Sequence, residues 1–173
     1  METPAPHAVP LDNWFVMVDA SWQETAPDAA PPPELILGGW HVDEDGNQGP
    51  FEPNPDYVPS DDSSPTDPTD AVLQRAINGD DVGGDIIPTL FDALVEIAGN
   101  DRGELLVGAA PDGVRCVCVV TAAVHKRRIE AERWIQILGS ELAKIVPDGV
   151  DILLNPNSRE QFRLHTGALR KPE

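Results

Sequence analysis

Cys116 and Cys118 are the side chains of this sequence with the most distinctive potential chemistry. They are its 2 cysteines, and residues two apart on a β-strand present their side chains on one face. Such a pair could bind a soft metal ion or act as a redox couple. The 4 histidines, which a metal would need as further ligands, are scattered at His7, His41, His125 and His165. Because Val117, Val119 and Val120 surround the cysteines, we expect buried, reduced and structural thiols.

Acidic side chains gather at two places where a cation could bind. Asp43, Glu44 and Asp45 are consecutive and are followed by Gly46 and Asn47. A calcium loop instead uses alternate positions and closes with a glutamate, so a solvated hairpin turn explains this stretch better. The second group is at most a weak cation site: Asp61, Asp62, Asp67 and Asp70. We expect no metal site in the chain.

Lys126, Arg127 and Arg128 form the one basic cluster, with Arg133 a little beyond it. Guanidinium and ammonium groups at this density could bind a phosphate or an acidic partner, which makes the cluster a secondary candidate for a binding site. A solvated helix face is the more common explanation of such a run. Docking of the cluster onto the acidic N-terminal half of the same chain is a third explanation.

Motifs of nucleophilic or metal-dependent hydrolysis are absent from the sequence. It has no Ser-x-x-Lys, no Gly-x-Ser-x-Gly and no His-Glu pair of the kind that such chemistry uses. Gly38 and Gly39 lie within a strand pattern that no helix follows, unlike the glycines of a phosphate-binding loop. We therefore expect a protein that is not an enzyme and that uses no cofactor. An enzyme with a ligand pocket at the turn of Asn155 and Pro156 is the remaining alternative.

Charge divides the chain into two unequal parts. The first basic residue is Arg75, and the 74 residues before it carry 15 of the 30 acidic side chains, so this stretch holds −15 of the net charge of −18. The rest of the chain has 15 acids against 12 bases and is close to neutral. A surface this acidic repels nucleic acids and anionic membranes and attracts basic or amphipathic partners. No apolar run is long enough to cross a bilayer, and no secretory signal is recognisable, so we expect a cytoplasmic protein.

Aromatic side chains concentrate in the same acidic half of the chain, where they could bind a partner protein. This half contains Trp14, Phe15, Trp22, Trp40, Phe51 and Tyr57. Aromatic groups surrounded by acids are typical of protein-binding surfaces, whereas packing in a core is the equally open alternative. Our candidate partner-binding residues are therefore Trp40, Phe51 and Tyr57, together with the acidic turn described above.

The elements that would position these residues begin with a small β unit. We expect residues 1–13 to be disordered and residues 14–60 to form a strand at Trp14–Val18 and a hairpin around the acidic turn, with its return strand reaching Phe51. Residues 61–68, rich in proline and aspartate, predict an extended connector.

Residues 69–173 predict an α+β domain with a mixed sheet. Helices are expected after a cap at Thr69 or Asp70 and over Ile86–Ala98, and strands over 104–109, 115–120 and 150–154. The stretch from 121 to 146 is ambiguous, and the glycine and serine at 139 and 140 favour a short basic helix, a strand over 134–138 and a helix opened by the serine. A last helix is expected near residue 158.

Two stretches resemble known families. The sequence Gly-Gly-Trp at 38–40, Asp-Gly at 45–46, and the run 51–60 with its continuation to Gln74 are similar to actinobacterial proteins described as associated with type VII secretion systems. Residues 147–156, which end in Leu-Leu-Asn-Pro, are similar to the end of the SseB-type domain, although Asn157 replaces the usual small residue after that turn. This resemblance implies a small α+β module and association with a secretion locus. It implies no catalytic residue.

These observations together predict a protein-binding accessory, either an adaptor or chaperone-like, that is associated with type VII secretion. The acidic aromatic half would engage a basic or amphipathic partner, and the α+β half would be the scaffold. The alternative is an immunity protein whose acidic surface neutralises a basic toxin.

Overall fold

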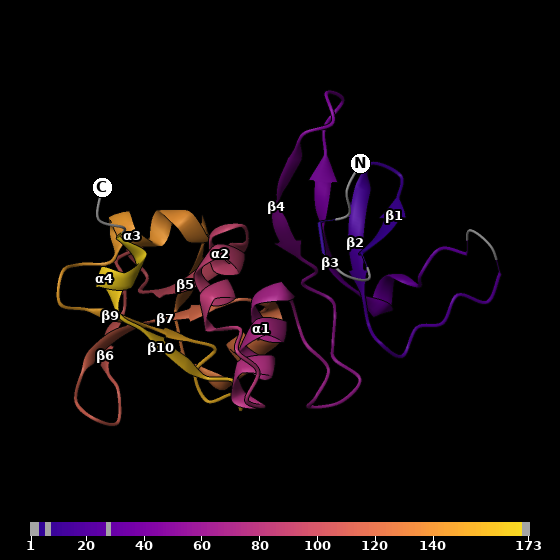
Figure 1. Cartoon of the computed structure of the whole chain (residues 1–173). Helices are drawn as coiled ribbons and strands as arrows, with labels where there is room; N and C mark the ends of the chain where they lie inside the picture. The colour runs from indigo at the N-terminus through magenta and orange to yellow at the C-terminus, as the bar shows by residue number, and fades with distance from the viewer. Residues whose placement is uncertain (1–3, 6–7, 27–28, 171–173) are drawn as a thin grey trace.

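The computed structural model describes residues 4–5, 8–26 and 29–170. Two β-sheets lie at opposite sides of the molecule, and the helices α1 (Pro68–Ile77) and α2 (Ile86–Phe91) lie between them (Figure 1). The N-terminal sheet is antiparallel and the C-terminal sheet is mixed, so the predicted α+β class with a small antiparallel unit is confirmed.

The N-terminal sheet is a meander in which neighbouring strands follow one another along the chain. Its strands are β1 (Ala8–Leu11), β2 (Trp14–Val18), β3 (Ile36–Val42) and β4 (Gln48–Pro53). A short 3-10 helix, η1 (Pro33–Leu35), leads into β3. Phe15, Trp40 and Phe51 are direct partners across β2, β3 and β4, so their side chains lie on one face of the sheet. That face points toward the helices.

Two glycines of β3 allow neighbouring atoms of the N-terminal sheet to pack closely against the strand. A Cβ atom on Gly38 would lie 2.6 Å from the ring of Phe51, and a Cβ on Gly39 would lie 2.6 Å from the carbonyl oxygen of Phe15. Gly38 also has φ of 151°. The Gly-Gly pair is therefore a packing requirement of the sheet, which supports the view that it is not a phosphate-binding loop.

The C-terminal sheet runs in the order β10-β9-β7-β5-β8, and β6 pairs with the first half of β7. Its strands are β5 (Leu94–Gly99), β6 (Val107–Ala109), β7 (Arg115–Val120), β8 (Arg133–Leu138), β9 (Asp151–Leu154) and β10 (Phe162–Leu164). β7 and β9 pair in parallel, and the segment that joins them crosses to the far side of β5 to form β8.

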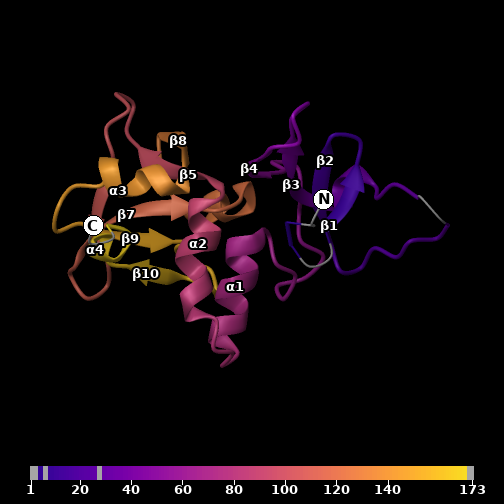
Figure 2. The same ribbon diagram turned by 45° about the horizontal axis from the view of Figure 1, so that its top comes forward.

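The helices α1 and α2 lie beside each other against one face of this sheet (Figure 2). The remaining helical elements are η2 (Gly83–Asp85), η3 (Ala123–Arg128), η4 (Gly139–Glu141), α3 (Leu142–Ile145) and α4 (Thr166–Leu169). Lys126 of η3 contacts Glu96 and Trp134, which lie on the opposite face of the sheet. Gly139 makes the approach of η4 to α2 possible, because a Cβ there would lie 1.8 Å from the carbonyl oxygen of Leu90.

The two sheets share one hydrophobic core. Trp40 and Phe51 of the N-terminal sheet belong to the same buried cluster as Leu73 of α1 and Leu90 of α2. The backbone N–H of Phe51 also donates a hydrogen bond of 2.7 Å to the carbonyl oxygen of Asp92, just before β5. The N-terminal unit is thus packed against the α+β part and is not an annex on a flexible tether.

Several predicted elements are confirmed. The strand at 14–18, the hairpin around residues 43–47, the strand pair across the turn at 111–113 and the strand at 134–138 all occur. The ambiguous stretch is broken at Gly139, as the sequence favoured, and its basic helix is the 3-10 helix η3.

Other predictions were wrong. The helix predicted over Ile86–Ala98 ends at Phe91, because residues 94–99 form β5 and pair with β8 over its whole length. No helix begins near residue 158; a strand and the short helix α4 follow there instead. Residues Ala8–Leu11 form β1 and not a disordered tail, whereas the prediction for residues 1–3 and 6–7 falls outside the described residues. The cap of α1 is Asp67 and not Thr69 or Asp70.

Helices of the described chain are all too short or too polar to cross a lipid bilayer.

Candidate functional site

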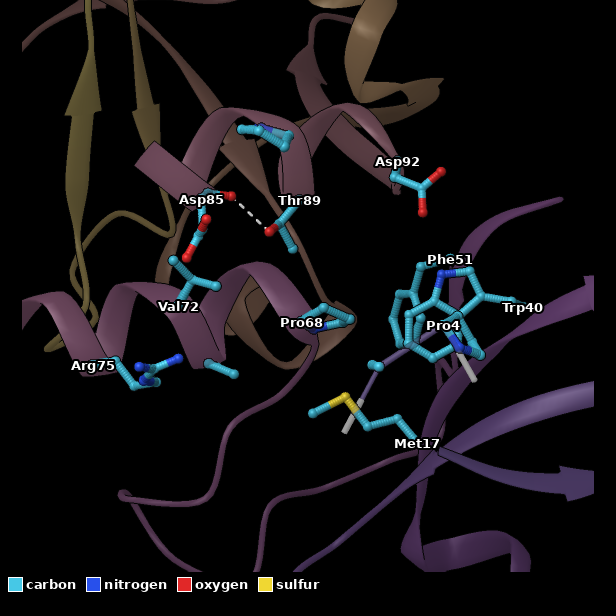
Figure 3. Close-up of a pocket in the computed structure, with 13 residues that line it drawn as sticks. Pro4, Met17, Trp40, Phe51, Pro68, Val72, Arg75, Asp85, Thr89 and Asp92 are labelled. Carbon is cyan, nitrogen blue, oxygen red and sulfur yellow. Dashed lines mark hydrogen bonds between the residues drawn. The ribbon is translucent and has the colours of Figure 1, made fainter. Parts of the chain in front are cut away.

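A groove of about 590 Å³ lies between the two helices α1 and α2 and the aromatic face of the N-terminal sheet (Figure 3). Trp40 and Phe51 line one end of it, while Val72 lines the other end on α1. The lining is mostly apolar and also includes Pro4, Ala5, Met17, Pro68, Ala71, Arg75, Asp85, Pro88, Thr89 and Asp92. A concave surface of this size and composition is typical of a binding site.

The aromatic end of the groove is rigid. The rings of Trp40 and Phe51 meet edge to face, with centroids 4.9 Å apart and planes at 65°. Burial raises the pKa of Asp92, and the nearby Trp40 side chain opposes this rise. Trp40 is 3% exposed, so its contacts in the core keep its ring in place as one end of the groove.

Charged groups lie along the edges of the groove. Asp85 and Asp92 flank α2, and Arg75 of α1 is paired with Asp80 at 3.0 Å, an ion pair in which both side chains are more than half exposed. The hydroxyl of Thr89 donates a hydrogen bond of 2.6 Å to the carbonyl oxygen of Asp85, so its proton is already used within the protein (Figure 3). The α2 edge is consequently acidic.

A buried polar cluster fixes the helix α1 that forms one wall of the groove. Asp67 caps α1, since its Oδ1 accepts hydrogen bonds from the backbone N–H groups of Thr69 and Asp70 at 2.9 and 3.0 Å. Its Oδ2 accepts from the hydroxyls of Thr66 at 2.8 Å and Thr121 at 2.6 Å. One carboxylate thus ties the connector, the first turn of α1 and the end of β7 together.

Asn155 brings the neighbouring strand end into the same cluster. Its side-chain oxygen accepts from the backbone N–H of Thr121 at 3.0 Å, and its amide nitrogen donates to the Thr121 hydroxyl at 2.9 Å. Asn155 has φ of 45°, a left-handed conformation that asparagine tolerates better than most residues. The Asn-Pro turn is therefore packed inside the protein, and both Asn155 and Pro156 are buried.

Two titratable groups of the cluster have displaced pKa values. Burial, and then the charge of Asp67, raise the pKa of Asp70 to about 7. Burial lowers the pKa of His125, whose Nε2 lies 3.0 Å from the Thr66 hydroxyl. Asp70 Oδ2 accepts from the Thr66 N–H at 3.1 Å, but its Oδ1 has no hydrogen-bond partner among the described residues. Asp70 is thus better suited to its site as a neutral acid.

The aromatic candidates from the sequence occupy different places. Trp40 and Phe51 are 3% and 1% exposed, and they line the groove from within the core. Tyr57 is 3% exposed and lies outside the groove, where its hydroxyl donates to Asp19 at 2.6 Å. The sequence left partner binding and core packing open for Tyr57. Its side chain is packed in the interior, beside Asp19 and the connector, so it is not exposed to a partner. Burial alone would raise the pKa of Asp19, but hydrogen bonds from Tyr57 and Ser21 outweigh it and lower the pKa.

Asp43, Glu44 and Asp45 lie at the exposed tip of the β3–β4 hairpin, away from the groove (Figure 1). Asp43 accepts hydrogen bonds from the side-chain amide of Asn47 at 3.0 Å and from the backbone N–H groups of Asn47 and Asp45 at 2.8 and 3.0 Å, which lower its pKa. This is the geometry of a turn closed by its own side chain. It agrees with the interpretation as a solvated hairpin turn.

The basic cluster faces other parts of the α+β domain. Lys126 pairs with Glu96 of β5 at 2.5 Å and lies 5.9 Å from the ring of Trp134. Arg128 donates to the carbonyl oxygen of Asn157 at 2.9 Å. Arg127 is exposed. Lys126 and Arg128 therefore bind groups near them in the C-terminal sheet, and these contacts do not dock the acidic N-terminal half.

The two cysteines are not bonded to each other. Cys116 is buried and Cys118 is partly buried, and burial raises the pKa of both thiols. A raised pKa leaves less thiolate at neutral pH and so disfavours reactivity. Among the side chains that the structure describes, no group of three or more His, Cys, Asp or Glu is arranged to hold a metal ion.

Most residues that line the groove could not be recognised as site residues in the sequence. Met17, Val72 and Pro88 come from three elements that are distant in the chain, and each one fits an ordinary apolar position of its own strand or helix. The sequence indicated only the aromatic pair Trp40 and Phe51, which lines one end of the groove. The role of Asp67 was also missed, although aspartate followed by proline is a common start of a helix.

Comparison with protein-family models, curated proteins and solved structures finds no match to this chain.

Proposed function

We propose that this protein is a non-enzymatic protein-binding accessory that captures its partner in the groove between α1, α2 and the N-terminal sheet. The observation that carries the proposal is the combination of a mostly apolar groove with an acidic edge at Asp85 and Asp92. Apolar contacts with rigid aromatic groups supply affinity, while the negative charge of the N-terminal half speeds the approach of a basic partner. The resemblance of residues 38–74 to proteins associated with type VII secretion, beside that of residues 147–156 to the SseB-type domain, supports a role as an adaptor or chaperone of type VII secretion.

Immunity against a toxin is the second candidate function. The net charge of −15 in the first 74 residues favours it, because a strongly acidic surface suits a basic toxin such as a nuclease. An immunity protein would bind one toxin tightly and with strong dependence on salt, whereas an adaptor would bind secretion substrates or machinery.

Affinity capture from native lysate with two matched variants tests the proposal. Val72→Lys places a cation in the groove, while Ile77→Lys places the same side chain on α1 at a position that is 47% exposed and outside the groove. Wild type and Ile77→Lys should retain the same partner, and Val72→Lys should lose it. The identity of the captured protein then separates secretion from immunity. Equal capture by both variants would place the interface elsewhere, with the exposed side of the basic cluster as the next candidate.

A further inference from the structure

The N-terminal segment of the chain occupies part of the groove. Pro4 and Ala5 both line it, and Ala5 packs against the shared hydrophobic core. In Figure 3, Pro4 lies at the end of the groove formed by Trp40 and Phe51, whereas Val72 lies at the opposite end. The carbonyl oxygen of Ala5 accepts a hydrogen bond of 3.2 Å from the N–H of Ala8, which links this segment to β1.

This contact indicates which kind of chain the groove accepts. Pro4 lines the same groove as Trp40 and Phe51. Grooves lined by aromatic side chains are used to bind extended proline-containing peptides. Such peptides lose little conformational entropy on binding, because proline already restricts the backbone. The native occupant is tethered to β1, so a partner segment must compete with it.

The charged groups of the groove indicate which side chains its ligand carries. Asp85 and Asp92 border the groove on the α2 side, and the carboxylate of Asp85 points toward Val72 in Figure 3. Arg75, the basic residue of the lining, is already paired with Asp80 at 3.0 Å. Pro4 and Ala5 have uncharged side chains, so they do not neutralise the carboxylates of this edge. A ligand with Lys or Arg beside its prolines would do so.

We propose that the groove binds an extended, proline-containing basic segment of the partner protein, which displaces Pro4 and Ala5. This proposal rests on the proposed protein-binding function and specifies its ligand. The occupied groove is the resting state, and the apparent affinity for the partner is reduced by the fraction of molecules in which the N-terminal segment is bound.

Peptide binding to the full chain tests the displacement. The probe is a capped synthetic peptide of alternating proline and lysine, with two controls in which glycine replaces proline or glutamate replaces lysine. Calorimetric titration should show binding of the first peptide alone, weakened by salt. The double variant Pro4→Ser, Ala5→Ser should bind this peptide about threefold or more tightly than wild type, because its groove is less often occupied. Val72→Lys should weaken binding about tenfold or more, and Ile77→Lys should not.

Each outcome bears on a different claim. Equal binding of the glycine control would overturn the requirement for proline and leave only charge attraction. Unchanged affinity in the double serine variant would overturn the displacement. If the proline–lysine peptide binds neither wild type nor the serine variant while lysate capture still depends on Val72, the ligand inferred here is wrong and the protein-binding function stands. If capture is also independent of Val72, both fail.

Discussion

Replacing Asp70 by asparagine should stabilise the protein at alkaline pH. Asp70 is 1% exposed, and its pKa is raised from 3.8 to about 7. The folded protein therefore binds this proton more tightly than the unfolded chain does. The stability that Asp70 contributes is complete below pH 3.8 and is lost as the pH rises through about 7.

The expected change in the free energy of unfolding follows from the size of the pKa shift of Asp70. One pKa unit corresponds to about 1.4 kcal/mol, so the ionised carboxylate costs the fold about 4 kcal/mol at pH 8 relative to the neutral acid. Asparagine preserves the acceptor that binds the N–H of Thr66 and the amide of Gln74. Its NH₂ group takes the place of Oδ1, which lacks a partner within the described chain. The amide thus resembles the protonated acid at every pH.

Urea unfolding of wild type and Asp70→Asn between pH 5 and pH 8, followed by tryptophan fluorescence, measures this difference. The advantage of the variant should be about 4 kcal/mol at pH 8 and should shrink by about 1.4 kcal/mol for each pH unit below about 7. Asp62→Asn removes the same charge from an exposed site and should change stability by less than about 0.5 kcal/mol. If Asp70→Asn is less stable than wild type at pH 8, the carboxylate is ionised and stabilised in the fold, and this reasoning is refuted.

Two further substitutions test the packing and the polar contacts around the N-terminal unit. Tyr57→Phe removes a hydrogen bond of 2.6 Å to the buried Asp19 and should cost about 1–3 kcal/mol in urea unfolding; an unchanged stability would mean that the remaining donors satisfy Asp19. Gly139→Ala would place a Cβ 1.8 Å from the carbonyl oxygen of Leu90 and should cost about 2 kcal/mol or more, whereas Gly108→Ala, which meets no atom within 4 Å, is its matched control.

The sequence predicted the fold class and the local hairpins because these depend on neighbouring residues. The acidic turn before Gln48 and the turn at Gly113, which has φ of 81°, each specify a reversal of the chain within a few residues. The α+β class with a mixed sheet followed from the alternation of helical and strand patterns after Pro68. These features need no knowledge of distant contacts.

The failed predictions depend on partners that are distant in the chain. Residues 94–98 were assigned to the end of a helix because Leu90, Leu94, Val95 and Ile97 recur at helical spacing. They form a strand between β7 and β8 instead, and a short apolar run of this kind does not distinguish a buried strand from a helix without knowledge of those distant partners.

The choice between partner binding and core packing for Tyr57 stayed open in the sequence for a similar reason. Its burial depends on Asp19, which is 38 residues away in the chain. The groove could be predicted only at Trp40 and Phe51, because its remaining walls meet through tertiary packing.

The parallel pairing of β7 and β9 has a consequence for synthesis on the ribosome. β9 can pair with β7 only after the intervening chain, which includes β8, has been synthesised. Closing so long a connection is slow compared with forming hairpins. Until Asn155 has left the ribosome and reached Thr121, the wall formed by α1 lacks one of its anchors. The groove is therefore completed only when nearly the whole protein has been made.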